Sequence, residues 1–295
     1  MLTSQVLLER IQRNAGVPWQ SQRADGFSDG ILLGSADTVV TGIVTTFAPT
    51  LEVLRRAVAS GRNTIICREA PFYSRGERAP LFWRNSPALP KEVTDNDPVC
   101  RAKQEFITRN NLVIIRLVEN WDARNTDSQL RGLTRALGWE RFHAVTTRSV
   151  DEYHPQNVCF QLPNSSLNQL AQNLKQRLRI QAVRVIGDPA SSVSKVALTH
   201  GLLLVADVER ILGQPMVDVV IAGDAVEWEA VPYFQDLVTA RKAKGLILLG
   251  QEASEEPGSG DMAAWLKSFV SEVPIEWIPA GEPFWTLAQA KASRR

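Results

Sequence analysis

The sequence predicts an α/β protein with parallel or mixed β-sheets flanked by helices. The first observation is that apolar, β-branched segments of strand length alternate with amphipathic segments of helix length along the chain. The second is that charged or polar residues stand where several of these apolar strands end. Because open α/β sheets bind ligands just beyond the carboxyl ends of their strands, we expect function at these strand ends.

The first half of the chain opens with a predicted helix and continues as a β-α-β unit. The apolar residues Val6, Leu7 and Ile11 share one helical face, and Ser4 is a candidate cap. The segment 49–60 has a proline near its start and a glycine after its end, which is typical of a helix. It joins two apolar strands, and such crossovers are right-handed and parallel. The predicted helices are 3–14, 49–60, 99–110 and 128–137, and the predicted strands are 39–47, 63–67 and 112–118.

The second half repeats this alternation. Its predicted strands are 157–162, 182–186, 193–198, 217–222, 245–250 and 275–278, and its predicted helices are 165–178, 231–243 and 262–270. We expect one domain boundary between residues 125 and 150, which divides the chain into 1–130 and 131–295. The segment 74–98 carries four prolines and no clear periodicity, so it is expected to be a long surface loop of functional or mobile character.

Composition narrows the class of protein. The 295 residues carry a net charge of +1, which disfavours general binding to nucleic acid or to an anionic membrane. No apolar run approaches the ~20 residues of a membrane span, and the N-terminus lacks a signal-peptide pattern, so a cytoplasmic protein is expected. The three cysteines, Cys67, Cys100 and Cys159, show no CxxC spacing and are expected to be free buried thiols.

Polar residues gather at four predicted strand ends. They are the pairs Arg68/Glu69, Glu119/Asp122 and Gln251/Glu255, together with Asp224. Such residues can form a metal site, an acid–base pair, or plain ion pairs and helix caps, and singly each favours a structural role.

Histidines and tryptophans are the other candidate residues. The spacing of His143, His154 and His200 fits no metal-ligand motif, so they are expected to be surface or core residues, although His200 follows a strand end. Trp121 and Trp285 could wall a binding cleft, but packing is the default expectation.

The chain resembles the Nif-three-like family (Ngg-interacting-factor-three-like), whose members are also described as GTP cyclohydrolase I type 2 homologues. The resemblance covers most of the chain. It rests on segments 41–47 (TGIVTTF), 50–57 (TLEVLRRA), 65–66 (II), 120–123 (NWDA), 222–225 (AGDA), 254–258 (SEEPG) and 279–285 (PAGEPFW). It implies two similar α/β lobes, a toroidal homo-hexamer, and a two-metal site in the cleft between the lobes.

The resemblance also implies which residues would hold the metal. In the family the first loop carries a His-His or His-Glu pair, where this chain has Arg68 and Glu69. The middle loop supplies an aspartate, which Asp122 matches. The last loop supplies a histidine and, four residues later, a glutamate, where this chain has Gln251 and Glu255. Glu69, Asp122 and Glu255 therefore remain as oxygen ligands, while two imidazole positions are lost.

This departure points to a degenerate metal site. Arginine cannot be deprotonated in proteins and cannot coordinate a metal, but it can replace a cation by pairing with Glu69, Asp122 or Glu255. A divalent metal such as zinc, iron, manganese or nickel is possible by resemblance, and we expect its binding to be weak or absent. Two alternatives remain. One is a metal-dependent hydrolase of a phosphate- or nucleotide-like substrate, and the other is an oligomeric scaffold or interaction protein.

Overall fold

The computed structural model describes residues 1–20, 29–72, 96–124, 128–142, 144–147, 157–212 and 217–286. The chain forms two compact lobes. The first lobe comprises Met1–Ser128 and Ser259–Ala280, and the second comprises Gln129–Gly258 and Gly281–Arg295. The sequence predicts a single boundary after residue 130. The structure differs in returning Ser259–Ala280 to the first lobe, because a strand in that segment pairs with the first lobe's sheet.

The first lobe contains a five-stranded sheet with the order β1-β4-β3-β2-β13. Strands β13, β2, β3 and β4 run parallel, and β1 adds an antiparallel edge. Their bounds are β1 Gly30–Leu33, β2 Ile43–Thr46, β3 Thr64–Cys67, β4 Val113–Arg116 and β13 Ile275–Trp277. Every residue of β2, β3 and β4 is buried, and their apolar residues follow one another instead of alternating with polar ones, as is typical of parallel strands covered on both faces.

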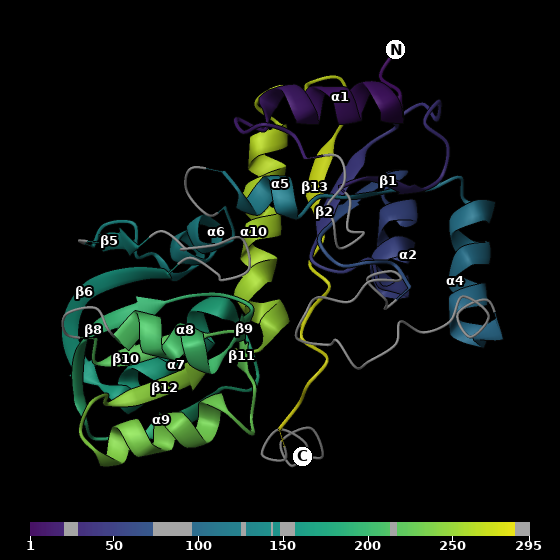
Figure 1. The fold of residues 1–295 in the computed structure, drawn as a ribbon. Helices are drawn as coiled ribbons and strands as arrows, with labels where there is room; N and C mark the ends of the chain where they lie inside the picture. The colour runs from purple at the N-terminus through teal and green to yellow at the C-terminus, as the bar shows by residue number, and fades with distance from the viewer. Residues whose placement is uncertain are drawn as a thin grey trace. The chain divides into compact units, whose positions relative to one another are not determined.

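Helices cover both faces of this sheet. Leu7 and Ile11 of α1 and Leu266 of α10 pack on one face, and Leu54 of α2 and Ile107 of α4 pack on the other. In Figure 1, α10 stands on one side of the strands and α2 and α4 on the other. The helix bounds are α1 Ser4–Asn14, α2 Leu51–Ala59, α4 Pro98–Arg109, α5 Glu119–Asp122 and α10 Gln251–Leu266.

The second lobe contains a six-stranded mixed sheet with the order β5-β6-β8-β10-β12-β7. Its centre, β8-β10-β12, is parallel, while β5, β6 and β7 are antiparallel to their neighbours. The strands are β5 Ala144–Thr147, β6 Asn157–Ser166, β7 Arg184–Gly187, β8 Ser192–Leu198, β10 Val219–Ala222 and β12 Gly245–Leu248, and β9 Leu202–Leu203 pairs separately with β11 Asp224–Ala225.

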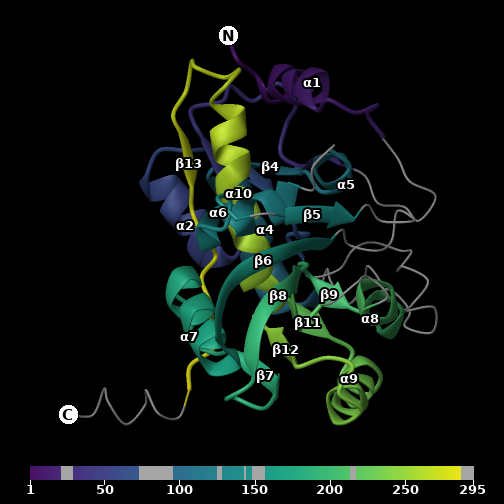
Figure 2. The ribbon, with the colours of Figure 1, turned by 90° about the vertical axis from the view of Figure 1, so that its left-hand side faces the viewer.

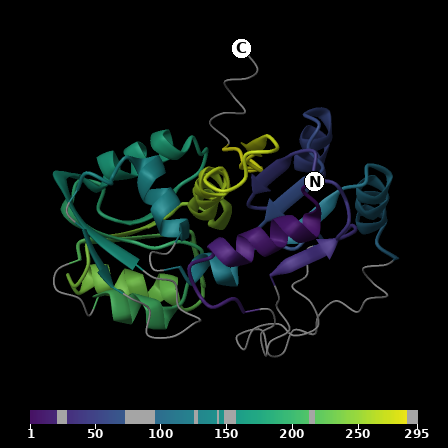
Figure 3. The ribbon, with the colours of Figure 1, turned by 90° about the horizontal axis from the view of Figure 1, so that it is seen from above.

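This sheet is also enclosed between two helical layers. Leu133 of α6 and Leu174 of α7 contribute to one apolar cluster, and Val208 of α8 and Phe234 of α9 contribute to the other. Figure 2 shows α7 on one side of the strands and α8 and α9 on the other, and Figure 3 shows the same layers from above. The helices are α6 Ser128–Leu137, α7 Leu167–Leu178, α8 Val205–Leu212 and α9 Ala230–Thr239. The α/β prediction is therefore confirmed in both lobes.

The main local correction concerns α10. The sequence predicts a helix over residues 262–270 and places Glu255 and Glu256 at a helix start, although Pro257 and three nearby glycines disfavour a continuous helix. The structure begins the helix at Gln251 and carries it through Pro257. The sequence patterns do not predict the strands β1, β5, β9 and β11 or the helix α8. They place the residues of α5 at the end of a strand. Across the described part of the chain, no helix has both the length and the apolar character needed to span a membrane.

Candidate functional site

Two strand-end residues of the first lobe form an ion pair. Arg68 follows β3 and Asp122 ends α5, just after the parallel neighbour β4, so the topology brings both to the carboxyl edge of the sheet. The Arg68 Nη1 donates to Oδ1 and Oδ2 of Asp122 at 2.9 and 2.8 Å. The two side chains are only 10% and 28% exposed. The predicted pairing of Arg68 with a carboxylate is confirmed, and its partner is Asp122.

A second buried charge network lies at the same sheet edge. Arg116, the last residue of β4, donates from Nη1 and Nη2 to the two carboxylate oxygens of Glu119 at 2.7 and 2.8 Å. Asp29 accepts hydrogen bonds from the backbone N–H groups of Val118 and Asn120 at 2.8 and 2.9 Å, and lies 3.3 Å from Arg116. The strand-end pattern in the sequence does not predict a role for Arg116 or Asp29. An arginine at the end of the apolar run VIIR was the available signal, because a buried arginine needs acidic partners.

Burial and charge set the protonation of this network. Burial and the neighbouring Glu119 raise the pKa of Asp29 to about 7. Burial alone would raise the pKa of Glu119, but the hydrogen bonds and charge of Arg116 lower it to about 2. Burial alone would lower the pKa of Arg116, yet Glu119, Asp29 and Glu69 raise it. The predicted ligand Glu69 is half-buried, and its negative charge is one of those that act on Arg116.

The second lobe brings His200 and Glu255 together. His200 follows β8 and Glu255 lies in α10, which follows β12, so both lie beyond the carboxyl ends of strands that flank β10. The Nδ1 of His200 is 2.9 Å from Oε1 of Glu255. Their residues are 5% and 2% exposed. His200 is thus a core histidine with a specific carboxylate partner.

Small residues allow this close approach. The Ser254 Oγ accepts from the Gly201 N–H at 3.0 Å and donates to the Gln251 carbonyl at 2.7 Å. Gly201 has a φ of +64°, and a Cβ there would lie 2.9 Å from Oε1 of Glu255. A Cβ on Gly223 would lie 2.4 Å from the Ser254 Oγ and 2.7 Å from the Gly201 carbonyl. Both positions therefore require glycine.

The other candidate residues take structural positions. Asp224 pairs with Arg184 at 2.6 Å on the surface. Trp121 is buried against Trp265 with ring centroids 5.1 Å apart, whereas Trp285 is 66% exposed. His143, His154 and nearly all of the predicted loop 74–98 lie outside the described residues.

The three cysteines are free thiols, and Cys67 and Cys100 are buried as predicted, whereas Cys159 is only partly buried. Cys67 lies directly before Arg68, and burial raises the pKa of its thiol to about 12. Its Sγ donates to the Ile115 carbonyl at 3.6 Å, so this thiol has a partner inside the sheet.

Two of the predicted oxygen ligands already have side-chain partners. Both oxygens of Asp122 accept hydrogen bonds from Arg68, and one oxygen of Glu255 contacts His200. Among the described residues, no set of three or more His, Cys, Asp or Glu side chains gathers as ligands for one ion. What the geometry provides is one carboxylate paired with an arginine in the first lobe and one carboxylate in contact with a histidine in the second.

The fold and these strand-end groups define a two-lobed α/β protein with acidic residues after its parallel strands. The chain belongs to the Duf34/NIF3 (NGG1p interacting factor 3) family, whose sequence profile matches residues 13–280. No protein among those with curated descriptions matches it in sequence.

Solved structures share the fold over nearly the whole chain. The Staphylococcus aureus hypothetical protein SA1388 is 16% identical, with a TM-score of 0.71, and the match covers 97% of this chain and 99% of that one. The Bacillus cereus protein related to NIF3 is 15% identical, with a TM-score of 0.69 and the same coverage. TTHA1606 from Thermus thermophilus is 17% identical, with a TM-score of 0.63 over 96% and 99% of the two chains. At these identities the likeness concerns the fold alone.

Proposed function

We propose that this chain is a Duf34/NIF3 protein whose metal site is degenerate, so that it acts by binding rather than by metal-dependent hydrolysis. The contact of Arg68 with both carboxylate oxygens of Asp122 carries this proposal. A guanidinium supplies there the positive charge that a cation would otherwise supply to the carboxylate.

The Glu255 contact supports the same proposal. A ligand glutamate must offer an oxygen to the metal, but Oε1 of Glu255 lies 2.9 Å from a ring nitrogen of buried His200. Gln251, at the former imidazole position, offers a carboxamide, which suits zinc, iron or nickel less well than imidazole does. Capture of a metal by Asp122 would have to displace Arg68, which contacts both carboxylate oxygens, whereas capture by Glu255 would have to use the oxygen that His200 does not contact.

A hydrolase of a phosphate- or nucleotide-like substrate is the alternative. It would need Glu69, Asp122 and Glu255 as ligands that activate a water molecule. The engagement of Asp122 and Glu255 by Arg68 and His200 disfavours it. An oligomeric scaffold remains compatible with the first proposal, since neither requires a metal.

Metal content and its effect on stability test the proposal. Protein purified without added metal or chelator is expected to hold well under one transition-metal ion per chain by elemental analysis. Addition of a chelator should leave the melting temperature unchanged, because a ligand that does not bind the folded state cannot stabilise it.

A variant that restores the imidazoles provides the positive control. Arg68→His combined with Gln251→His should bind zinc or nickel more tightly than the wild type in a calorimetric titration. Close to two metal ions per wild-type chain, or a wild-type melting temperature that falls with chelator, would refute the proposal.

A further inference from the structure

We propose that a pocket in the second lobe binds a small organic anion with a flat apolar body. The pocket has a volume of about 290 Å³ and is formed by the end of α6, the residues that follow it, β6 and one face of α7. At roughly 30 Å³ per water-sized group, it holds on the order of ten non-hydrogen atoms. None of the strand-end groups described above contributes to it.

One side of the pocket is apolar and aromatic. Trp139, Leu162 and Leu170 belong to the buried core of the lobe, and Phe142 packs against that core. Trp139 is held by an edge-to-face contact with Phe160, with ring centroids 5.3 Å apart. The apolar wall is therefore preformed, which favours a flat hydrophobic group on the ligand.

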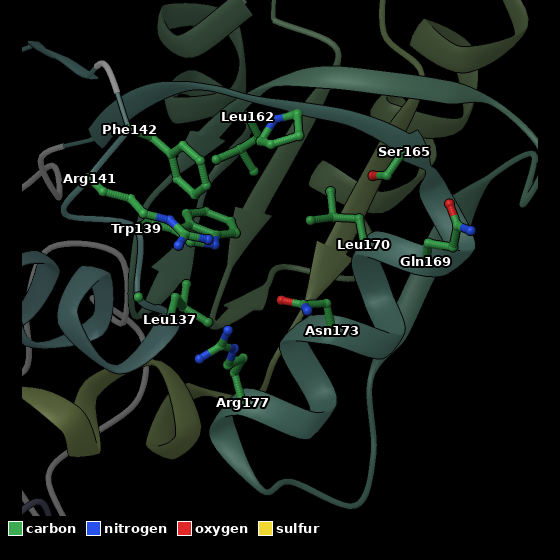
Figure 4. A pocket seen from close by; sticks show the side chains of 12 residues that line it. Leu137, Trp139, Arg141, Phe142, Leu162, Ser165, Gln169, Leu170, Asn173 and Arg177 are labelled. Atoms are coloured by element: carbon green, nitrogen blue, oxygen red, sulfur yellow. The ribbon is translucent and has the colours of Figure 1, made fainter.

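The other side is polar and cationic. Asn173 and Arg177 are four residues apart on α7 and so lie on the same helical face. Figure 4 shows them on the opposite side of the pocket from Trp139 and Phe142. The guanidinium of Arg141 lies 4.9 Å from the centroid of the Phe142 ring, which places a second positive charge beside the aromatic wall.

The charge of the lining selects the ligand. Arg141 and Arg177 line the pocket, and the lining residues that the structure describes include no aspartate or glutamate. Within the described ranges, neither arginine forms an ion pair with a carboxylate. The helix dipole accounts for a cation in the last turn of α7, but it does not account for Arg141. One guanidinium group lies beside the aromatic wall and the other lies across the pocket from it. Together they fit a phosphate or carboxylate attached to a ring.

Binding of simple probes tests this inference. Phenyl phosphate and phenylacetate carry both features, phenol carries the ring alone, and inorganic phosphate carries the charge alone. Ligand-observed NMR titration of the full chain should show saturable binding of at least one aromatic anion, and clearly weaker binding of phenol and inorganic phosphate. The ratio of the dissociation constants of phenyl phosphate and phenylacetate shows which anionic group the arginines prefer.

Matched variants test whether the aromatic anion binds in this pocket. Arg177→Gln and Arg141→Gln should each weaken aromatic-anion binding about tenfold, because charge-assisted hydrogen bonds are lost. Lys175→Gln removes the same charge from an exposed position of α7 outside the pocket and should leave binding unchanged. Asn173→Trp, at an exposed helix position, should fill the pocket and abolish binding while the melting curve shows a folded protein. Absence of saturable binding, phenol binding as tight as the anions, or equal effects of the Arg177 and Lys175 variants would overturn the inference.

Discussion

The side chains of Arg68 and Asp122 form a largely buried ion pair at a strand end. The guanidinium contacts both oxygens of the neighbouring carboxylate directly. Because the pair is largely buried, the loss of one partner leaves the other poorly solvated.

Arg68→Ala is therefore expected to destabilise the protein. The cost should be about 1–3 kcal/mol, between the values for exposed and fully buried ion pairs, and should appear as a lower melting temperature. Arg184→Ala is the matched control, because its pairs with Asp224 and Glu227 are both exposed and each should cost less than about 1 kcal/mol. Equal losses in the two variants would contradict the structural role of Arg68.

Glu252 predicts a pH dependence of stability. Burial, and then the charge of Glu282, raise the pKa of Glu252 to about 7. Its Oε1 is buried and has no hydrogen-bond partner among the residues that the structure describes. A carboxyl whose pKa is raised in the folded state binds a proton more tightly there, so its contribution to stability is present below its unfolded pKa of 4.5 and is lost as pH rises through about 7.

Glu252→Gln should remove this loss. The variant should melt at a higher temperature than the wild type at pH 8, and the difference should vanish near pH 4.5 because glutamine resembles the protonated acid. Glu209→Gln makes the same charge change on the exposed side of α8 and serves as the control. The prediction fails if the two variants show the same melting-temperature profile against pH.

At the scale of elements, the contact between α6 and α10 depends on glycine. A Cβ on Gly132 of α6 would lie 2.6 Å from the Pro257 carbonyl and 2.7 Å from the backbone of Gly258. Both neighbours are backbone atoms of α10, which cannot move without shifting the helix. The small residues that make α10 look unlike a helix in sequence are therefore needed for this packing.

Gly132→Ala tests whether packing or helix propensity decides this contact. Propensity alone would stabilise the helix by about 1 kcal/mol, whereas overpacking typically costs about 1–3 kcal/mol. We expect a net loss of stability in thermal melting. Gly61→Ala, at a site with no atom within 4 Å of the added Cβ, reports the cost of a positive φ without a steric clash. A higher melting temperature for Gly132→Ala would show that the helices separate easily.

At the scale of the whole molecule, the oligomeric state stays a prediction. Resemblance to the family implies six chains, and closed point-group symmetry is the usual outcome for homo-oligomers. Light scattering coupled to size-exclusion chromatography should report about six times the 32.7 kDa chain mass. A single-chain mass throughout the micromolar concentration range would exclude the hexamer.

Local pattern was sufficient for most of the elements. The helix Ser128–Leu137 follows from apolar periodicity, and the buried strands β2, β3 and β4 follow from short apolar runs, because each signal is contained in one short segment. The strand-end positions of Arg68, Asp122 and Glu255 follow from the same pattern. The family also follows from the sequence, and its profile match confirms it.

Only the tertiary structure determined which partner each charged group takes, which lobe contains the segment Ser259–Ala280, and where α10 begins. Arg68 could have paired with any of three carboxylates, and His200 had no partner assigned, because such contacts join residues 54 or 55 positions apart. The segment Ser259–Ala280 joins the first lobe since β13 pairs with β2 across more than 200 residues. The early start of α10 has the same origin: packing against α6 and burial of Glu255 outweigh a weak local helix propensity, and sequence periodicity carries no information about either contact.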